Sequence, residues 1–121
     1  MAEKDAKGFR TLHAWQMAYE LTLDIYKITK KFPKEEIYGL TSQLQRAAVS
    51  VPANIAEGYE RNHIKEYLQF LFIAKGSLGE IETYLMLASD LHYMTQAEYD
   101  NIDEKRAKSA RILIGLIKSL K

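Results

Sequence analysis

The titratable side chains of this sequence fall into no catalytic or metal-binding pattern. His13, His63 and His92 are isolated, so no pair has the i, i+4 spacing that puts two imidazoles on one face of a zinc-binding helix. The sequence contains no cysteine, which removes thiolate ligands and nucleophiles. Glu80 and Glu82 are two residues apart and point to different faces of a helix. The sequence therefore predicts a protein without enzymatic activity, metal or cofactor.

Basic residues form the clearest chemical feature. From Lys105 to Lys121 the chain carries six basic residues and no acid, although the formal net charge of the whole chain is only +1. A second basic group spans residues 27–34. Cations near helix C-termini favour the helix dipole, and the same cations suit phosphate binding, so both interpretations stay open. The candidate nucleic-acid-binding residues are Lys105, Lys108, Arg111, Lys118, Arg46 and Arg61.

A polar stripe with helical spacing crosses the segment 40–59. Pro52 lies inside this segment, removes one backbone hydrogen bond and is expected to kink the helix. The stripe is either a ligand or RNA contact surface or an ordinary solvated or intersubunit face. Its members are Gln43, Arg46, Ser50, Asn54, Glu57 and Arg61.

Arg106 stands near the centre of an apolar stripe. A guanidinium in such a place is very costly unless it reaches a carboxylate, so a structural ion pair is expected. The predicted partners, one of them a buried carboxylate, are Glu57, Glu80 and Glu82.

Four helices must position these residues. Apolar residues recur with a period of 3.6 in four segments, and the short connections favour antiparallel neighbours. The sequence predicts an all-α, up-and-down four-helix bundle in one domain, residues 1–121. The expected helices are 12–32, 40–59, 63–91 and 95–120. The expected core consists of Ala18, Leu21, Ile25, Ile28, Phe32, Leu40, Leu44, Ala47, Val51, Ile55, Tyr67, Leu71, Ala74, Leu78, Ile81, Leu85, Ala88, Tyr99, Ile102, Ala110, Leu113, Ile117 and Leu120.

Helix boundaries follow from local signals. Pro33 disfavours helical geometry in the residue before it and so ends the first helix. Thr41 or Ser42 is expected to cap the second helix and Asn62 the third. The run Thr95-Gln96-Ala97-Glu98 predicts a capping box at the start of the fourth.

Three helices carry more apolar surface than one core needs, which favours a homo-oligomer over a monomer with a wide core. A solvated face would carry Lys, Glu and Gln instead. Glycine inside a helix costs up to about 1 kcal/mol relative to alanine, so Gly76 and Gly79 indicate close backbone approach. The aromatic residues could also stack on unpaired bases. The predicted interface consists of Leu12, Trp15, Tyr19, Tyr26, Phe72, Gly76, Gly79, Thr83 and Met86, with small residues Val49, Ala53 and Ala56 as a further stripe.

Composition places the protein among globular chains. Hydrophobic residues make up 47% and charged residues 27% of 121 residues. No apolar run approaches the roughly 18 residues that would cross a bilayer. The charged segment 1–10 does not read as a signal peptide. A cytoplasmic location without membrane contact or small-molecule substrate is therefore expected.

A long motif in the second helix resembles a known family. The run Leu44-Gln45-Arg46-Ala47-Ala48-Val49-Ser50-Val51-Pro52-Ala53-Asn54-Ile55-Ala56-Glu57-Gly58-Tyr59 is similar to the signature of four-helix-bundle proteins encoded in intervening sequences of bacterial 23S ribosomal RNA genes. Supporting matches are Trp15-Gln16-Met17-Ala18, Phe32-Pro33-Lys34-Glu35-Glu36, Tyr38-Gly39-Leu40 and Ala74-Lys75-Gly76-Ser77. The resemblance extends from about Phe9 to Leu120.

The resemblance implies a fold and two functions. The family is similar to accessory proteins of diversity-generating retroelements, which form barrel-shaped homopentamers and bind nucleic acid together with a reverse transcriptase. It implies a ring-like homopentamer that binds RNA or DNA through basic residues of the first and fourth helices. The alternative is a structural or protein-interaction module whose partner is another protein.

Overall fold

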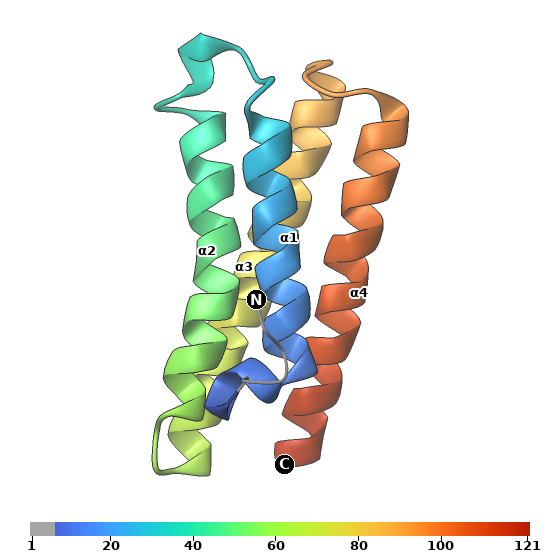
Figure 1. Ribbon diagram of the computed structural model, residues 1–121. Helices are drawn as coiled ribbons and strands as arrows, with labels where there is room; N and C mark the ends of the chain where they lie inside the picture. Colours follow the sequence, from blue (N-terminus) through green and yellow to red (C-terminus); the bar gives the residue numbers. More distant parts are fainter. Residues whose placement is uncertain (1–6) are drawn as a thin grey trace.

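The computed structural model describes residues 7–121. Four long helices stand side by side, each antiparallel to the next, with one short 3-10 turn before α1 and another between α1 and α2 (Figure 1). No strand occurs within the described range. The elements are η2 Gly8–Thr11, α1 His13–Thr29, η3 Lys34–Glu36, α2 Leu40–Tyr59, α3 Ile64–Asp90 and α4 Gln96–Leu120. The predicted all-α, up-and-down four-helix bundle is confirmed.

The four helices occupy the corners of a square. α1 packs against α2 and α4, and α3 packs against the same two helices, so α1 lies diagonal to α3 and α2 lies diagonal to α4. Most of the core residues named from periodicity are buried, among them Leu44, Leu71 and Leu113. The exceptions are only partly buried and pack against this core: Ile28, Tyr67, Tyr99, Ala110 and Leu120. Each large apolar side chain of this kind contributes about 1.5–3 kcal/mol by leaving water.

Helix caps agree with the sequence only where the signal is strictly local. Thr95 caps α4 in the predicted capping box, in which Thr95 Oγ1 accepts from the Glu98 amide and the Glu98 carboxylate accepts from the Thr95 amide. The predicted caps of α2 and α3 are wrong: their N-cap residues are Gly39 and His63, without a side-chain cap. At α2 the carboxylate of Glu36 accepts the Leu40 amide instead, at 2.9 Å. The first backbone amide of α2, which has no partner within the helix, thus donates to a side chain of the preceding turn.

α1 is shorter than predicted, ending at Thr29 rather than near residue 32. The following amides bond three residues back, Lys31 to Ile28 and Phe32 to Thr29, so the last turn tightens into a non-α geometry. Phe32 nevertheless remains buried against the Tyr93 ring.

α2 runs continuously through Pro52 because a neighbouring helix supplies the missing donor. Proline has no amide to give to the carbonyl of Ala48, which is fully buried. The Thr22 hydroxyl of α1 approaches that carbonyl at 3.0 Å, sharing its proton with the Ala18 carbonyl. The buried Ala48 carbonyl, which Pro52 leaves without an amide donor, is therefore hydrogen-bonded across the contact between α1 and α2.

The middle of the polar stripe of α2 packs against α3. Ser77 of α3 lies 2.9 Å from Ser50 between the hydroxyl oxygens, and Asn54 donates to Ser50. Tyr84 of α3 donates to Gln43 at 3.1 Å. The other four members of the stripe are exposed to solvent: Gln43, Arg46, Glu57 and Arg61.

Candidate interaction surfaces

The structure separates the six predicted nucleic-acid-binding residues into two groups. Arg46 lies on α2 and Arg61 directly after it, whereas the other four lie on the diagonal helix α4. Arg61 is also occupied, because it pairs with Glu57 at 3.0 Å and covers the Phe70 ring at 4.9 Å. The two groups therefore lie on helices that are diagonal to each other in the bundle.

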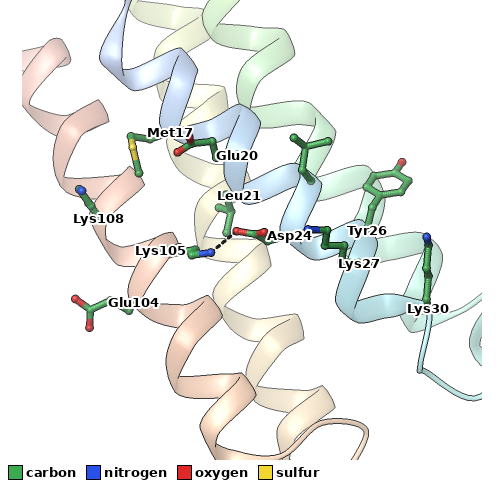
Figure 2. Close-up of a pocket in the computed structure, with 11 residues that line it drawn as sticks. Met17, Glu20, Leu21, Asp24, Tyr26, Lys27, Lys30, Glu104, Lys105 and Lys108 are labelled. Carbon is green, nitrogen blue, oxygen red and sulfur yellow. Dashed lines mark hydrogen bonds and ion pairs between the residues drawn. The ribbon is translucent and has the colours of Figure 1, made fainter. Parts of the chain in front are cut away.

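α4 therefore carries the basic side of the bundle, together with α1. Lys105 is neutralised by Asp24 of α1, with 2.6 Å between Nζ and Oδ2 (Figure 2). Lys108, Arg111 and Lys118 are exposed and make no ion pair with any residue of the described range.

A groove of about 800 Å³ follows the boundary between α1 and α4 (Figure 2). Lys27, Lys30 and Lys108 line it without an ion pair inside the described part of the chain. Glu20 and Glu104 also line it, so the groove is mixed in charge rather than uniformly basic. Sequence reasoning placed both lysine clusters on helices one and four but gave no sign that they share one groove.

The apolar stripe predicted on α3 is exposed. Phe72 is 44% and Met86 50% accessible, and ideal Cβ atoms placed on Gly76 and Gly79 would meet no atom within 4 Å. Thr83 lies exposed between them. The sequence analysis missed Ile73, Leu87 and Leu91, which are also about half exposed. Ile73 directly follows Phe72 and Leu87 directly follows Met86. Apolar residues at these neighbouring positions could have indicated that the exposed patch is wider than the stripe.

The predicted stripe on α1 needs a correction. Trp15 is buried, with its ring between Phe9 at 5.3 Å and Tyr19 at 4.9 Å, and so belongs to the core of its own chain. Leu12 packs partly against the same core. Trp15 is therefore open neither to a second subunit nor to a base. Tyr19 and Tyr26 remain partly exposed, and Tyr26 also lines the groove between α1 and α4. Val49 and Ala53 of α2 are exposed as well.

Arg106 is ion-paired as predicted, but its partners are not buried. Its Nε lies 2.6 Å from Asp103, which the sequence analysis missed, and its Nη2 lies 3.4 Å from Glu82, which it named. The Arg106 side chain is 12% exposed and that of Glu82 is 50% exposed. The expectation of a buried carboxylate is wrong, because only the arginine stem enters the apolar layer.

The turn between α1 and α2 presents two apolar side chains that the sequence analysis overlooked. Tyr38 is 97% and Ile37 52% exposed. Glu36 anchors this turn by accepting the Leu40 amide and the Tyr93 hydroxyl, the latter at 2.8 Å. These two hydrogen bonds, the amide bond first, hold the pKa of Glu36 below its ordinary value.

Two further kinds of site were sought in residues 7–121. No group of three or more histidine and acidic side chains there is arranged to hold a metal ion. No described helix combines the length and apolarity that crossing a membrane requires.

These features define a small four-helix bundle that presents two apolar surface stripes and one basic side. The chain belongs to the family of 23S rRNA-intervening sequence proteins, whose sequence profile matches residues 10–115. This confirms the resemblance drawn from the α2 motif. The structure is similar to the crystal structure of a protein of unknown function from the S23 ribosomal protein family of Bacteroides thetaiotaomicron. The two share 24% identity and a TM-score of 0.81, over 87% of this chain and 98% of the other. No curated protein matches the chain.

Proposed function

We propose that the protein is a non-enzymatic, homo-oligomeric accessory protein that binds nucleic acid in the cytoplasm. One observation carries the proposal: the two apolar stripes lie on opposite sides of the bundle, and the basic α1–α4 side lies between them. Tyr26 is the one stripe residue that also lines the groove, so assembly through the stripes leaves most of that basic side uncovered in every subunit.

The opposite placement follows from contacts within the chain. Tyr19 and Tyr26 stand three residues before and four residues after Thr22, which bonds to α2, so they share its side of α1. On α3, Phe72 lies under the ammonium of Lys121 of α4, at 5.3 Å from the ring centre. One stripe therefore faces outward along the α1–α2 edge and the other along the α3–α4 edge. A two-fold dimer would bury only one of them, whereas head-to-tail contacts bury both and form a ring if the rotation between subunits closes.

The two stripes also lie at the same height along the bundle. The bond from Thr22 sets α1 level with Ala48 of α2, and the bond between Ser50 and Ser77 sets α2 level with the middle of α3. Tyr19 and Tyr26 thus flank the level of Gly76 and Gly79. A ring with its axis along the helices needs this match, because rotation about the axis preserves height. The number of five subunits is taken from the resemblance.

The basic side gives such a ring a repeated phosphate-binding surface. Lys27, Lys30 and Lys108 line the groove, and Arg111 and Lys118 extend the surface along α4. Each subunit adds the same contacts, so weak attraction at one site becomes useful avidity around the ring.

Assembly is tested by sedimentation velocity over a range of concentrations. Met86→Lys alters only an exposed side chain and is expected to dissociate the oligomer into folded subunits. The control is Leu23→Lys, since Leu23 is equally exposed but lines the groove. A wild-type protein that sediments as a monomer throughout would refute the assembly.

Nucleic-acid binding is tested by fluorescence anisotropy with labelled RNA. Affinity is expected to fall as salt rises, with a slope of about −0.7 to −0.9 per phosphate neutralised. Lys108→Glu and Arg111→Glu are expected to weaken binding. Arg46→Glu makes the same charge change on the diagonal helix and is expected to leave binding nearly unchanged. Equal losses in all three variants would mean that only net charge matters.

The alternative is a protein-interaction module without a nucleic-acid role. The neutralisation of Lys105 by Asp24 and of Arg61 by Glu57 favours it, because both cations are withdrawn from the predicted phosphate contacts. Absence of binding to single-stranded and structured RNA at low salt would make this alternative the better account.

A further inference from the structure

The α1–α2 turn contains the most exposed aromatic side chain of the described residues. Tyr38 is 97% accessible to solvent, and its neighbour Ile37 is 52% accessible. An exposed tyrosine alone is unremarkable, because folded proteins expose much apolar surface. The turn that carries Tyr38 is, however, unusually well anchored.

Five hydrogen bonds hold the turn in place. The amides of Glu36, Ile37 and Gly39 each bond three residues back, at 2.9–3.1 Å. The Glu36 carboxylate then joins the turn to Leu40 of α2 and to Tyr93 in the α3–α4 connection. An ideal Cβ on Gly39 would lie 2.6 Å from Glu36 Oε1, so glycine makes this close approach of the carboxylate possible. The turn presents the Tyr38 ring to solvent in a defined position.

Two lysines precede Tyr38 in the same connection. Lys30 directly follows α1 and Lys34 begins η3, at eight and four residues before Tyr38. Neither forms an ion pair with a residue of the described range, whereas Lys31 is held by Glu98 at 2.6 Å. Of the two acids in the turn, Glu36 is occupied by its hydrogen bonds, which leaves Glu35 as the opposing charge.

We propose that this turn binds single-stranded nucleic acid, with Tyr38 stacking on an unpaired base and Lys30 and Lys34 contacting the adjacent phosphates. An exposed aromatic ring on a connection that also carries unpaired lysines is a combination that suits single-stranded nucleic acid, because every base has a face to stack and every linkage carries a charge. A pre-anchored turn loses little conformational entropy on binding. The inference rests on the proposed nucleic-acid function and specifies its ligand as unpaired strand.

The turn also stays accessible in the proposed assembly. It lies at the end of the bundle, beyond the end of α1 (Figure 1), whereas the two apolar stripes meet at mid-height. Each subunit of a ring would therefore present one Tyr38 at the same end, so that one strand could contact several turns.

The experiment compares fluorescein-labelled oligouridine with an RNA duplex of equal length, by anisotropy at low salt. Tyr38→Ala is expected to weaken binding of the single strand by about 10-fold or more, the effect of losing one stacked base. Binding of the duplex is expected to stay unchanged. Tyr38→Phe keeps the ring and should bind like the wild type, and Ile37→Ala is the matched control at the neighbouring exposed position. Lys30→Gln and Lys34→Gln are expected to weaken both ligands and to reduce the salt slope.

The possible failures are distinguishable. If the wild type binds RNA and Tyr38→Ala binds the single strand equally well, the inference is overturned and the proposed function stands. Equal losses for single strand and duplex also overturn it, because stacking needs an unpaired base. If the wild type binds neither RNA, both proposals fail, and a protein becomes the ligand to seek at this turn.

Discussion

The glycines of α3 allow a decisive test, because alanine should have opposite effects on the single chain and on its assembly. Ideal Cβ atoms at Gly76 and Gly79 meet no atom within 4 Å, so a methyl group costs nothing inside one chain. Replacing an exposed helical glycine with alanine stabilises the helix by up to about 1 kcal/mol, or a few degrees in Tm. Gly76→Ala and Gly79→Ala are therefore expected to stabilise the folded subunit.

The same methyl groups should weaken a close subunit contact. Adding a methyl group to a tightly packed interface costs about 1–3 kcal/mol, which corresponds to roughly 5- to 150-fold in Kd for each contact. Gly115→Ala is the matched control, because Gly115 is an exposed helical glycine on α4 whose Cβ also meets nothing within 4 Å. It should stabilise the fold equally and leave assembly unchanged.

Stability and assembly must be measured separately, since association raises apparent stability by mass action. Urea unfolding is carried out in the Met86→Lys background, where the subunits are expected to be dissociated. Sedimentation velocity is carried out in the wild-type background. If Gly76→Ala and Gly79→Ala associate as tightly as the wild type, no second backbone approaches α3 and the proposed interface is wrong.

Gly58 provides the contrast within one chain. Its Cβ would lie 2.9 Å from Phe70 Cβ and 3.0 Å from Tyr67 Cδ1, at the contact between α2 and α3. Gly58→Ala should therefore destabilise the monomer itself, by about 1–3 kcal/mol less the gain in helix propensity. A stabilised Gly58→Ala variant would show that such distances do not predict the response to alanine.

Three further predictions concern the fold. Thr22→Val should lower the free energy of unfolding by about 1–3 kcal/mol, measured by urea unfolding. The loss should be smaller in a Pro52→Ala background, because the alanine restores an amide donor to the Ala48 carbonyl. Equal losses in both backgrounds would contradict this coupling. Arg106→Ala should lower the free energy of unfolding by about 1–2 kcal/mol, because its carboxylate partners remain solvated without it. Arg106→Met should recover the part of this loss that comes from packing of the aliphatic stem. A loss near about 4 kcal/mol would indicate a buried ion pair. Because the folded pKa of Glu36 is depressed, its contribution is complete above the unfolded value near 4.5 and is lost as pH falls through the folded pKa. The free energy of unfolding, measured in urea, should thus fall less between neutral and acid pH in Glu36→Gln than in the wild type. The same pH profile in both proteins would rule this contribution out.

Local sequence patterns determined the helices and most of the core. The 3.6-residue period placed Leu44, Val51 and Ile55 on one buried face of α2, because helical geometry alone decides which side chains share a face. The capping box at Thr95 was equally predictable, since both of its partners lie within four residues. The α2 motif also identified the family.

Contacts between distant segments decided the rest. Lys105 is neutralised by Asp24, 81 residues earlier, and Trp15 is buried by Phe9 and Tyr19, so neither serves the role that its residue type suggested. The missing amide of Pro52 predicted a kink, but a hydroxyl from α1 satisfies the carbonyl it leaves free.

The arrangement of helices settled which surfaces can act together. Sequence spacing orders residues around one helix but does not state which helices are neighbours. Only the square packing places Arg46 diagonal to the basic residues of α4 and sets the two apolar stripes on opposite sides at one height. The exposure of Tyr38 likewise depends on a carboxylate that anchors the turn to the α3–α4 connection, 57 residues away. The sequence by itself thus determined which residues are apolar, basic or helical, and the tertiary structure decided which of them water, another subunit or a ligand can reach.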